Sequence, residues 1–126
     1  MAVLSMGNPH AVLTVKDTQQ AHVEILGAYL ESHELFPKRV NVGFMEIVSS
    51  HHIRLRVFER GVGETLACGT GACAAVVSGI KRHLLISPVK VDMPGGSLSI
   101  DWKGSSSPVM MKGPAVTLYE GDIEIT

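Results

Sequence analysis

A cysteine stands at the point where a glycine-rich loop leads into a long apolar run. Cys68 lies in the segment Ala-Cys-Gly-Thr-Gly at positions 67–71. If a helix begins there, its first N–H groups lack internal partners and its dipole adds partial positive charge. A thiolate is then favoured, and we expect a pKa below the free value of about 8.5. The same N–H groups can hold a carboxylate or phosphate, and Gly69 and Gly71 let a ligand approach the backbone. The segment could therefore supply both a base and an anion cradle.

The spacing alone leaves a second interpretation open, in which Cys68 is a small buried hydrophobe and the glycines only form a turn. Cys73 lies within the apolar run itself, where an inert thiol is expected. The two cysteines are five positions apart with no Cys-x-x-Cys pair, and the six histidines form no cluster, so we expect no metal site. His51 and His52 are expected to lie in a turn and to face solvent.

Three polar islands interrupt apolar sequence elsewhere in the chain. Asn8 and His10 flank a proline near the start, where an Asn-Pro pair ordinarily forms a turn. Asn41 lies between two valines of a predicted strand, where a buried amide needs hydrogen-bond partners. Glu59 and Arg60 close another predicted strand just before the glycine-rich loop, and most such charge pairs contribute little. Each island taken alone is consistent with an ordinary structural role.

The apolar pattern predicts two helices among many strands. Asp17 and Gln20 resemble a capping box in front of an amphipathic helix predicted over 19–31. A second helix, apolar almost all round and therefore interior, is predicted to follow Cys68 over 72–80. Alternating and short apolar runs predict strands at 10–15, 40–48, 53–58, 89–93, 98–102, 109–112, 115–119 and 123–125. Strands on both sides of a buried helix imply an α+β fold, with mostly antiparallel strands wrapped around that helix.

Length and composition exclude several classes of protein. The 126 residues suit a single domain, and 45% hydrophobic residues can form a real core. A net charge of −1 without a Lys/Arg run excludes a basic protein that binds nucleic acid by neutralising phosphates. No apolar stretch reaches the ~20 residues of a membrane span, and the first residues lack the features of a signal peptide. With two cysteines and no disulfide framework, a reducing cytoplasm is the expected location.

Several motifs recur in one order along the chain. They are Gly-Asn-Pro-His at 7–10, the segment 36–44, the stretch Glu-Arg-Gly-x-Gly-Glu-Thr-x-Ala-Cys-Gly-Thr-Gly at 59–71, Pro-Gly-Gly at 94–96 and Gly-Pro-Ala at 113–115. In this order they resemble diaminopimelate epimerase, and the resemblance runs through essentially the whole chain. The stretch at 59–71 is its most specific part.

The resemblance implies a cofactor-independent isomerase that interconverts LL- and meso-diaminopimelate in lysine and peptidoglycan precursor synthesis. The family fold has two similar lobes, each with strands around a central helix and each with one catalytic cysteine. One thiolate removes the α-proton while the other thiol delivers a proton to the opposite face. Inversion requires this arrangement because the base and the acid must lie on opposite faces of the carbon.

Individual residues take roles from the same resemblance. Cys68 matches the catalytic cysteine of the second, C-terminal lobe, and Gly69 and Thr70 match the backbone cradle for the reacting carboxylate. Glu59 and Arg60 match contacts to the ammonium and carboxylate groups of the substrate. The remaining matches are Asn8 and Asn41 as substrate-binding amides, His10 with Glu59 as tuners of the cysteine pKa, and Tyr119 as a dimerisation residue.

The first lobe of the family, with its own Cys-Gly-Asn motif, has no counterpart in this sequence. Cys73 cannot replace its cysteine, because a residue on the same helix as Cys68 does not reach the opposite face of a substrate. We therefore expect residues 1–126 to be a single domain equivalent to the second lobe, and to be inactive alone. Its expected partners are the missing first lobe, diaminopimelate and, in the complete protein, a second copy in a homodimer.

Two alternatives remain, a neighbouring enzyme and a protein of another class. A proline racemase-like or phenazine-biosynthesis-like isomerase shares the architecture, but Glu59, Arg60 and the two asparagines suit an amino acid with two charged ends better. A non-catalytic anion-binding or dimerisation module is disfavoured by the complete set of residues around Cys68.

Overall fold

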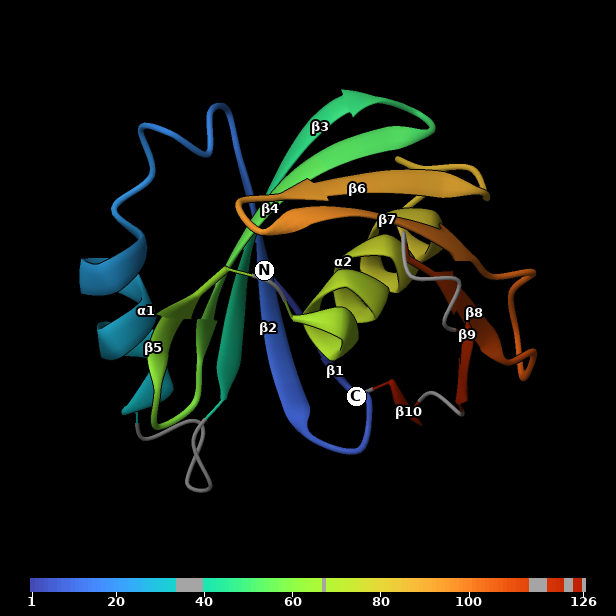
Figure 1. Cartoon of the computed structure of the whole chain (residues 1–126). Helices are drawn as coiled ribbons and strands as arrows, with labels where there is room; N and C mark the ends of the chain where they lie inside the picture. The colour runs from blue at the N-terminus through green and yellow to red at the C-terminus, as the bar shows by residue number, and fades with distance from the viewer. Residues whose placement is uncertain (34–39, 67, 114–117, 122–123, 126) are drawn as a thin grey trace.

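The fold is one curled sheet with a helix against each face (Figure 1). The structure, a computed structural model, describes residues 1–33, 40–66, 68–113, 118–121 and 124–125. The strands are β1 Ala2–Ser5, β2 Pro9–Val15, β3 Asn41–Ser49, β4 His52–Glu59, β5 Gly63–Thr65, β6 Val89–Met93, β7 Gly96–Asp101, β8 Val109–Lys112, β9 Leu118–Gly121 and β10 Glu124–Ile125. The helices are α1 Val23–Glu31 and α2 Gly69–Lys81.

Strand order and direction follow the predicted class. The order is β10-β1-β2-β3-β4-β6-β7-β8-β9, with β5 paired to β4. Among the described residues the pairs are antiparallel except β2–β3 and β4–β6. A parallel pair needs a long crossover connection, and α1 and α2 lie in those two connections. The prediction of an α+β fold with mostly antiparallel strands is confirmed. Residues 115–117 and 123, which belong to two predicted strands, lie outside the described residues.

Helix α2 lies inside the curl of the sheet (Figure 1). Its residues 71–79 are all buried, and it contacts β1, β2, β3, β4, β7 and β8. The two outermost strands are close in sequence, because β9 ends at Gly121 and β10 begins at Glu124. Three Cα steps span at most about 11 Å, so the two edges of the sheet must come near each other. The curl brings strands from both halves of the sheet to the helix.

Two separate apolar clusters hold the helices in place. Leu55 and Val57 of β4 belong to the cluster around α2, whereas Phe58 belongs to the cluster under α1, with Val23. Successive residues of a strand point to opposite faces, so each side chain of β4 is assigned to one helix or the other. Glu59, two residues after Val57, therefore lies on the face that carries α2.

The start of α1 differs from the prediction. The helix begins at Val23, and its N-cap, His22, makes no capping hydrogen bond with its side chain. Asp17 instead accepts a hydrogen bond from the Gln19 N–H through Oδ1 at 2.9 Å and one from the Gln20 N–H through its carbonyl at 3.2 Å. The predicted capping box was wrong, because the short Asp17 side chain satisfies a local turn instead of a helix terminus. Among the described residues, no helix is long and apolar enough to cross a membrane.

Close packing at the end of α2 gives a stability prediction. A Cβ at Gly79 would overlap the side chain of Leu85, which is buried. We expect Gly79→Ala to destabilise the fold by about 1–3 kcal/mol, since overpacking outweighs the gain of up to ~1 kcal/mol in helix propensity. Urea unfolding followed by the fluorescence of Trp102, the only tryptophan, measures the change. Gly43→Ala is the control, because its Cβ would meet Leu55 at an ordinary 3.5 Å. Equal stability of the two variants would contradict the packing argument.

Candidate active site

Cys68 is the N-cap of α2. Its backbone is extended, with φ −143° and ψ 104°, and its Sγ accepts a hydrogen bond from the Gly71 N–H at 3.3 Å. The Thr70 hydroxyl lies 3.6 Å from the same sulfur. A Cβ at Gly71 would lie 3.0 Å from Val57 Cγ2 and 3.2 Å from the sulfur, so the first turn of α2 packs tightly against β4 and the thiol at this glycine. The predicted location of the thiol at a helix N-terminus is confirmed.

The predicted direction of the Cys68 pKa was wrong. Burial of the thiol is the largest effect, and it raises the pKa above the ordinary value. Hydrogen bonds from Thr70 and Gly71 lower the pKa, as the helix-terminus argument requires, but Glu59 raises it through its charge and its hydrogen bond with the thiol. The sequence pattern identified the donors but not the extent of burial, which here outweighs them.

The raised pKa gives a measurable expectation for the thiol. In a Cys73→Ala background, Cys68 of this chain should be alkylated by iodoacetamide more slowly than a free cysteine at pH 7, because only the thiolate reacts. The rate should rise with pH through a midpoint above that of the free thiol. A faster reaction at pH 7 would show that the helix terminus outweighs burial after all.

Glu59 is the last residue of β4 and lies on the α2 face of the sheet. Its Oε1 accepts a hydrogen bond from the Thr65 hydroxyl at 2.8 Å. The carboxylate acts on two other predicted site residues, because its charge raises the pKa of both Cys68 and His10. Thr65 was not among the residues singled out from sequence, since its partner is known only once β5 is seen to fold back along β4.

Asn41 joins three parts of the site through its amide. Its Oδ1 accepts a hydrogen bond from the Arg60 backbone N–H at 2.6 Å, and its Nδ2 donates one to the Pro9 carbonyl at 3.3 Å. The side chain is buried, with 4% of its surface exposed. The expectation that a buried amide here needs partners is confirmed, and the partners are backbone groups at the start of β2 and the end of β4.

His10 is buried beside Asn41 in the parallel β2–β3 pair. Burial lowers its pKa from 6.5 to about 4, while Glu59 raises it and Arg60 lowers it further. The imidazole is therefore neutral at pH 7. Its Nε2 lies 3.1 Å from Asn8 Oδ1, and a carbonyl oxygen accepts only, so Nε2 carries the proton. Asn8 and His10 thus form a hydrogen-bonded pair rather than a bare turn.

The structure brings most of the predicted residues together at the N-terminal end of α2. Gly69 and Thr70 form its first turn, whose N–H groups lack partners within the helix. Tyr119 is different: its backbone pairs with Met111 in the β8–β9 ladder, and its side chain lies outside the described part of the structure. Gly95, of the Pro-Gly-Gly motif, makes a contact that sequence reasoning did not predict: its N–H donates to the Leu66 carbonyl at 2.7 Å and anchors the chain just before the cysteine.

Comparison with known proteins identifies the family that shares this sequence. The family model described as diaminopimelate epimerase matches residues 2–118. The chain belongs to the diaminopimelate epimerase family. The curated diaminopimelate epimerases of Herminiimonas arsenicoxydans and Azoarcus sp. (strain BH72) are 64% and 61% identical to it over 125 residues. These matches cover 99% of this chain but only 44% and 45% of the relatives, so the chain spans less than half of their length.

A solved structure supports the fold of this family member. The chain is similar to the crystal structure of the Bacillus anthracis phenazine biosynthesis protein of the PhzF family, with a TM-score of 0.59 and 20% identity. The match covers 87% of this chain and 37% of the other. At that identity the likeness shows a common fold.

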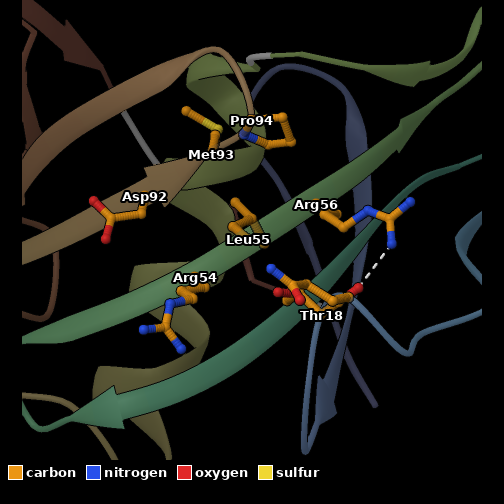
Figure 2. Close-up of a pocket in the computed structure, with 8 residues that line it drawn as sticks. Thr18, Arg54, Leu55, Arg56, Asp92, Met93 and Pro94 are labelled. Carbon is orange, nitrogen blue, oxygen red and sulfur yellow. Dashed lines mark hydrogen bonds between the residues drawn. The ribbon is translucent and has the colours of Figure 1, made fainter.

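One cavity of this epimerase-family chain lies away from Cys68. It has a volume of about 490 Å³ and is lined by Thr18, Gln19, Arg54, Leu55, Arg56, Asp92, Met93 and Pro94 (Figure 2). Arg56 Nη1 donates a hydrogen bond to the Thr18 carbonyl at 2.7 Å, drawn as a dashed line in Figure 2. Arg54 and Arg56 alternate with Leu55 along β4, so their side chains point away from α2. None of the predicted site residues lines this cavity.

A histidine at the same face departs from its predicted setting. His52 is part of β4, and its Nε2 lies 2.6 Å from Asp92 Oδ2, with 27% of the side chain exposed. The prediction that His52 faces solvent in a turn was wrong, because β4 begins one residue earlier than predicted and pairs with β6 there. His51 is exposed, as predicted. Among the described residues, no three His, Cys, Asp or Glu side chains lie together as a metal site would need.

Proposed function

We propose that this chain is the second lobe of a cofactor-independent diaminopimelate epimerase and carries one of its two catalytic cysteines. The observation that carries the proposal is the setting of Cys68, an N-cap thiol bonded by the Gly71 N–H and the Thr70 hydroxyl and acted on by the Glu59 carboxylate. The family membership of the chain and the names of its relatives supply the substrate. Their greater length leaves room for a first lobe with the second cysteine.

The proposed reaction is a two-base inversion at the α-carbon. A thiolate on one face takes the α-proton and becomes a thiol, while the thiol on the other face gives its proton to the same carbon and becomes a thiolate. The raised pKa of Cys68 favours the thiol at neutral pH, which suits it to deliver the proton. Thr70 and Gly71 stabilise the thiolate that this step leaves behind, so the same residue can act in both directions.

The proposed substrate contacts follow from charge. The first N–H groups of α2, at Gly69 and Thr70, suit the reacting carboxylate, whose developing negative charge also gains from the helix dipole. The Glu59 carboxylate suits an ammonium group, and the Arg60 guanidinium suits a carboxylate in bidentate geometry. Asn8 and Asn41 complete the set; one Asn41 N–H already goes to Pro9, which leaves its second N–H for the substrate.

The half-buried position of Cys68 at the N-terminal end of α2 suits a site completed by another lobe. Small-molecule sites are ordinarily concave, and the cavity of about 490 Å³ is lined by none of the proposed site residues. A first lobe placed over the N-terminal end of α2 would enclose the substrate there. The same proposal includes a homodimer of the complete protein with Tyr119 at its interface, a cytoplasmic location, and a role in lysine and peptidoglycan precursor synthesis.

The test uses a two-lobe protein, in which this chain is joined to the part of the Herminiimonas enzyme that it does not match. We expect this protein to convert LL- to meso-diaminopimelate in deuterated water and to place one deuterium at the inverted carbon. Mass spectrometry of the product measures both. The intact Herminiimonas enzyme serves as the positive control. Turnover of proline but not of diaminopimelate would replace the proposal with a proline racemase-like function.

A further inference from the structure

The Glu59 carboxylate is held by a residue on the neighbouring strand. In the antiparallel β4–β5 pair, Thr65 lies opposite Val57, and Gly63 lies opposite Glu59. Thr65 and Glu59 are thus diagonal neighbours on one face of the sheet, within reach of each other. The Thr65 hydroxyl donates to Glu59 Oε1 at 2.8 Å. Because that bond occupies one carboxylate oxygen, it restricts the rotation of the side chain and fixes the direction of the other oxygen.

The Cys68 thiol lies near the face of the sheet that carries Thr65 and Glu59. Val57 lies on it, and a Cβ at Gly71 would touch both Val57 and the Cys68 sulfur, so these groups are packed together. Glu59 follows Val57 on the same face and is half-buried at the end of the strand. A glutamate there could equally turn its carboxylate outward to water. The hydrogen bond from Thr65 opposes that alternative.

We propose that Thr65 is a positioning residue that holds the Glu59 carboxylate beside the Cys68 thiol. This inference rests on the proposed function only for its catalytic consequence, namely that the thiol keeps its proton until the substrate is bound. The geometry itself belongs to this chain and requires neither the substrate nor a first lobe.

The consequence concerns the protonation of Cys68. Glu59 raises the pKa of Cys68, so a carboxylate released toward solvent should raise it less. Other described groups are tied to this pair: Thr70 and Gly71 lower the Cys68 pKa, Cys73 is electrostatically coupled to Cys68, and Glu59 and Arg60 both act on the His10 pKa. Removal of the Thr65 hydroxyl alone replaces none of these groups, and Cys73 is alanine in every protein compared. The expected change is therefore a lower pH midpoint for the reaction of Cys68.

The experiment is a double-mutant cycle in a Cys73→Ala background, read as the rate of iodoacetamide alkylation of Cys68 against pH. Glu59→Gln should shift the midpoint downward, and Thr65→Val, which keeps the shape but lacks the hydroxyl, should shift it part of the way. Thr65→Ser should restore the parent midpoint. In the Glu59→Gln background, Thr65→Val should cause no further shift, because the two groups act as one unit.

A purely structural Thr65 gives different results. An unchanged midpoint in folded Thr65→Val, an equal shift in both backgrounds, or failure of Thr65→Ser to restore the parent value would each overturn the proposal. Circular dichroism and urea unfolding establish that each variant is folded, and Thr65→Ala replaces Thr65→Val if the latter does not fold. Since no substrate is present, a negative result leaves the proposed epimerase function unaffected, and a failure of that function leaves this test intact.

Discussion

Replacing Cys68 with alanine in the two-lobe protein is expected to reduce kcat for diaminopimelate epimerisation by about 10²–10⁴-fold, the usual contribution of a positioned acid or base. Alanine removes the sulfur but leaves the first turn of α2, whose N–H groups still bind the carboxylate. The loss should therefore fall mainly on kcat rather than on KM. Conversion of LL- to meso-diaminopimelate, followed by chiral chromatography, measures both constants.

Cys73 is the matched control for this change. It lies further along α2 and is fully buried, and burial raises its pKa to about 12. An inert, protonated thiol at that position contributes only packing, so Cys73→Ala should leave kcat within a few-fold of the parent. Substantial epimerisation by Cys68→Ala, or an equal loss in both variants, would remove Cys68 from the proposed mechanism.

Acid is expected to destabilise this chain through His10. The folded state holds the imidazole neutral with a pKa of about 4, whereas the unfolded chain has the ordinary value of 6.5. Between those values the unfolded state binds more protons, so the stability is fully present above pH 6.5 and is lost as the pH falls toward 4. The gap between the two pKa values corresponds to about 3 kcal/mol.

The comparison with His10→Gln isolates that contribution. Glutamine can donate a hydrogen bond to Asn8 in place of the imidazole but does not titrate. The test compares how the stability of each protein changes with pH, so a difference between the two proteins at pH 7.5 does not affect it. Urea unfolding of both proteins at several pH values between 7.5 and 4, followed by Trp102 fluorescence, should show a smaller acid-induced loss for the variant by about 3 kcal/mol. Glu46 and Asp92, whose pKa values are lowered, also lose stabilisation in acid, but equally in both proteins. Parallel pH profiles would contradict a neutral buried His10.

Much of the fold could be predicted because buried residues recur in the sequence with the period of a strand or a helix. The alternation of Ile53, Leu55 and Val57 with arginines predicted β4, and the apolar run after Cys68 predicted a buried helix, as α2 shows. Short elements contain too few residues to show such a period. Residues 63–65 were predicted as loop. They form the strand β5 because the chain folds back after β4 and pairs with β4.

The candidate site was harder to predict where an effect depends on distance rather than on residue type. A cysteine at a helix N-terminus was expected to favour the thiolate, and the donors are indeed present. The net direction of the pKa shift reverses because the thiol is half-buried and because Glu59 acts on it, and neither fact is written in the local sequence. Partners such as Thr65 for Glu59 and Gly95 for Leu66 likewise emerge only from the pairing of strands and turns.

The central claim is that the chain holds one half of a two-cysteine site. Exchange of the α-proton of diaminopimelate with deuterated water, followed by proton NMR, tests it most directly when this chain alone is compared with the two-lobe protein. Exchange at the α-carbon needs a base and a bound substrate carboxylate in one enclosed site. The claim is that this chain alone does not provide that enclosed site. We predict no detectable exchange by the isolated chain and full exchange by the two-lobe protein. Appreciable exchange by the isolated chain would contradict the claim that two lobes are needed.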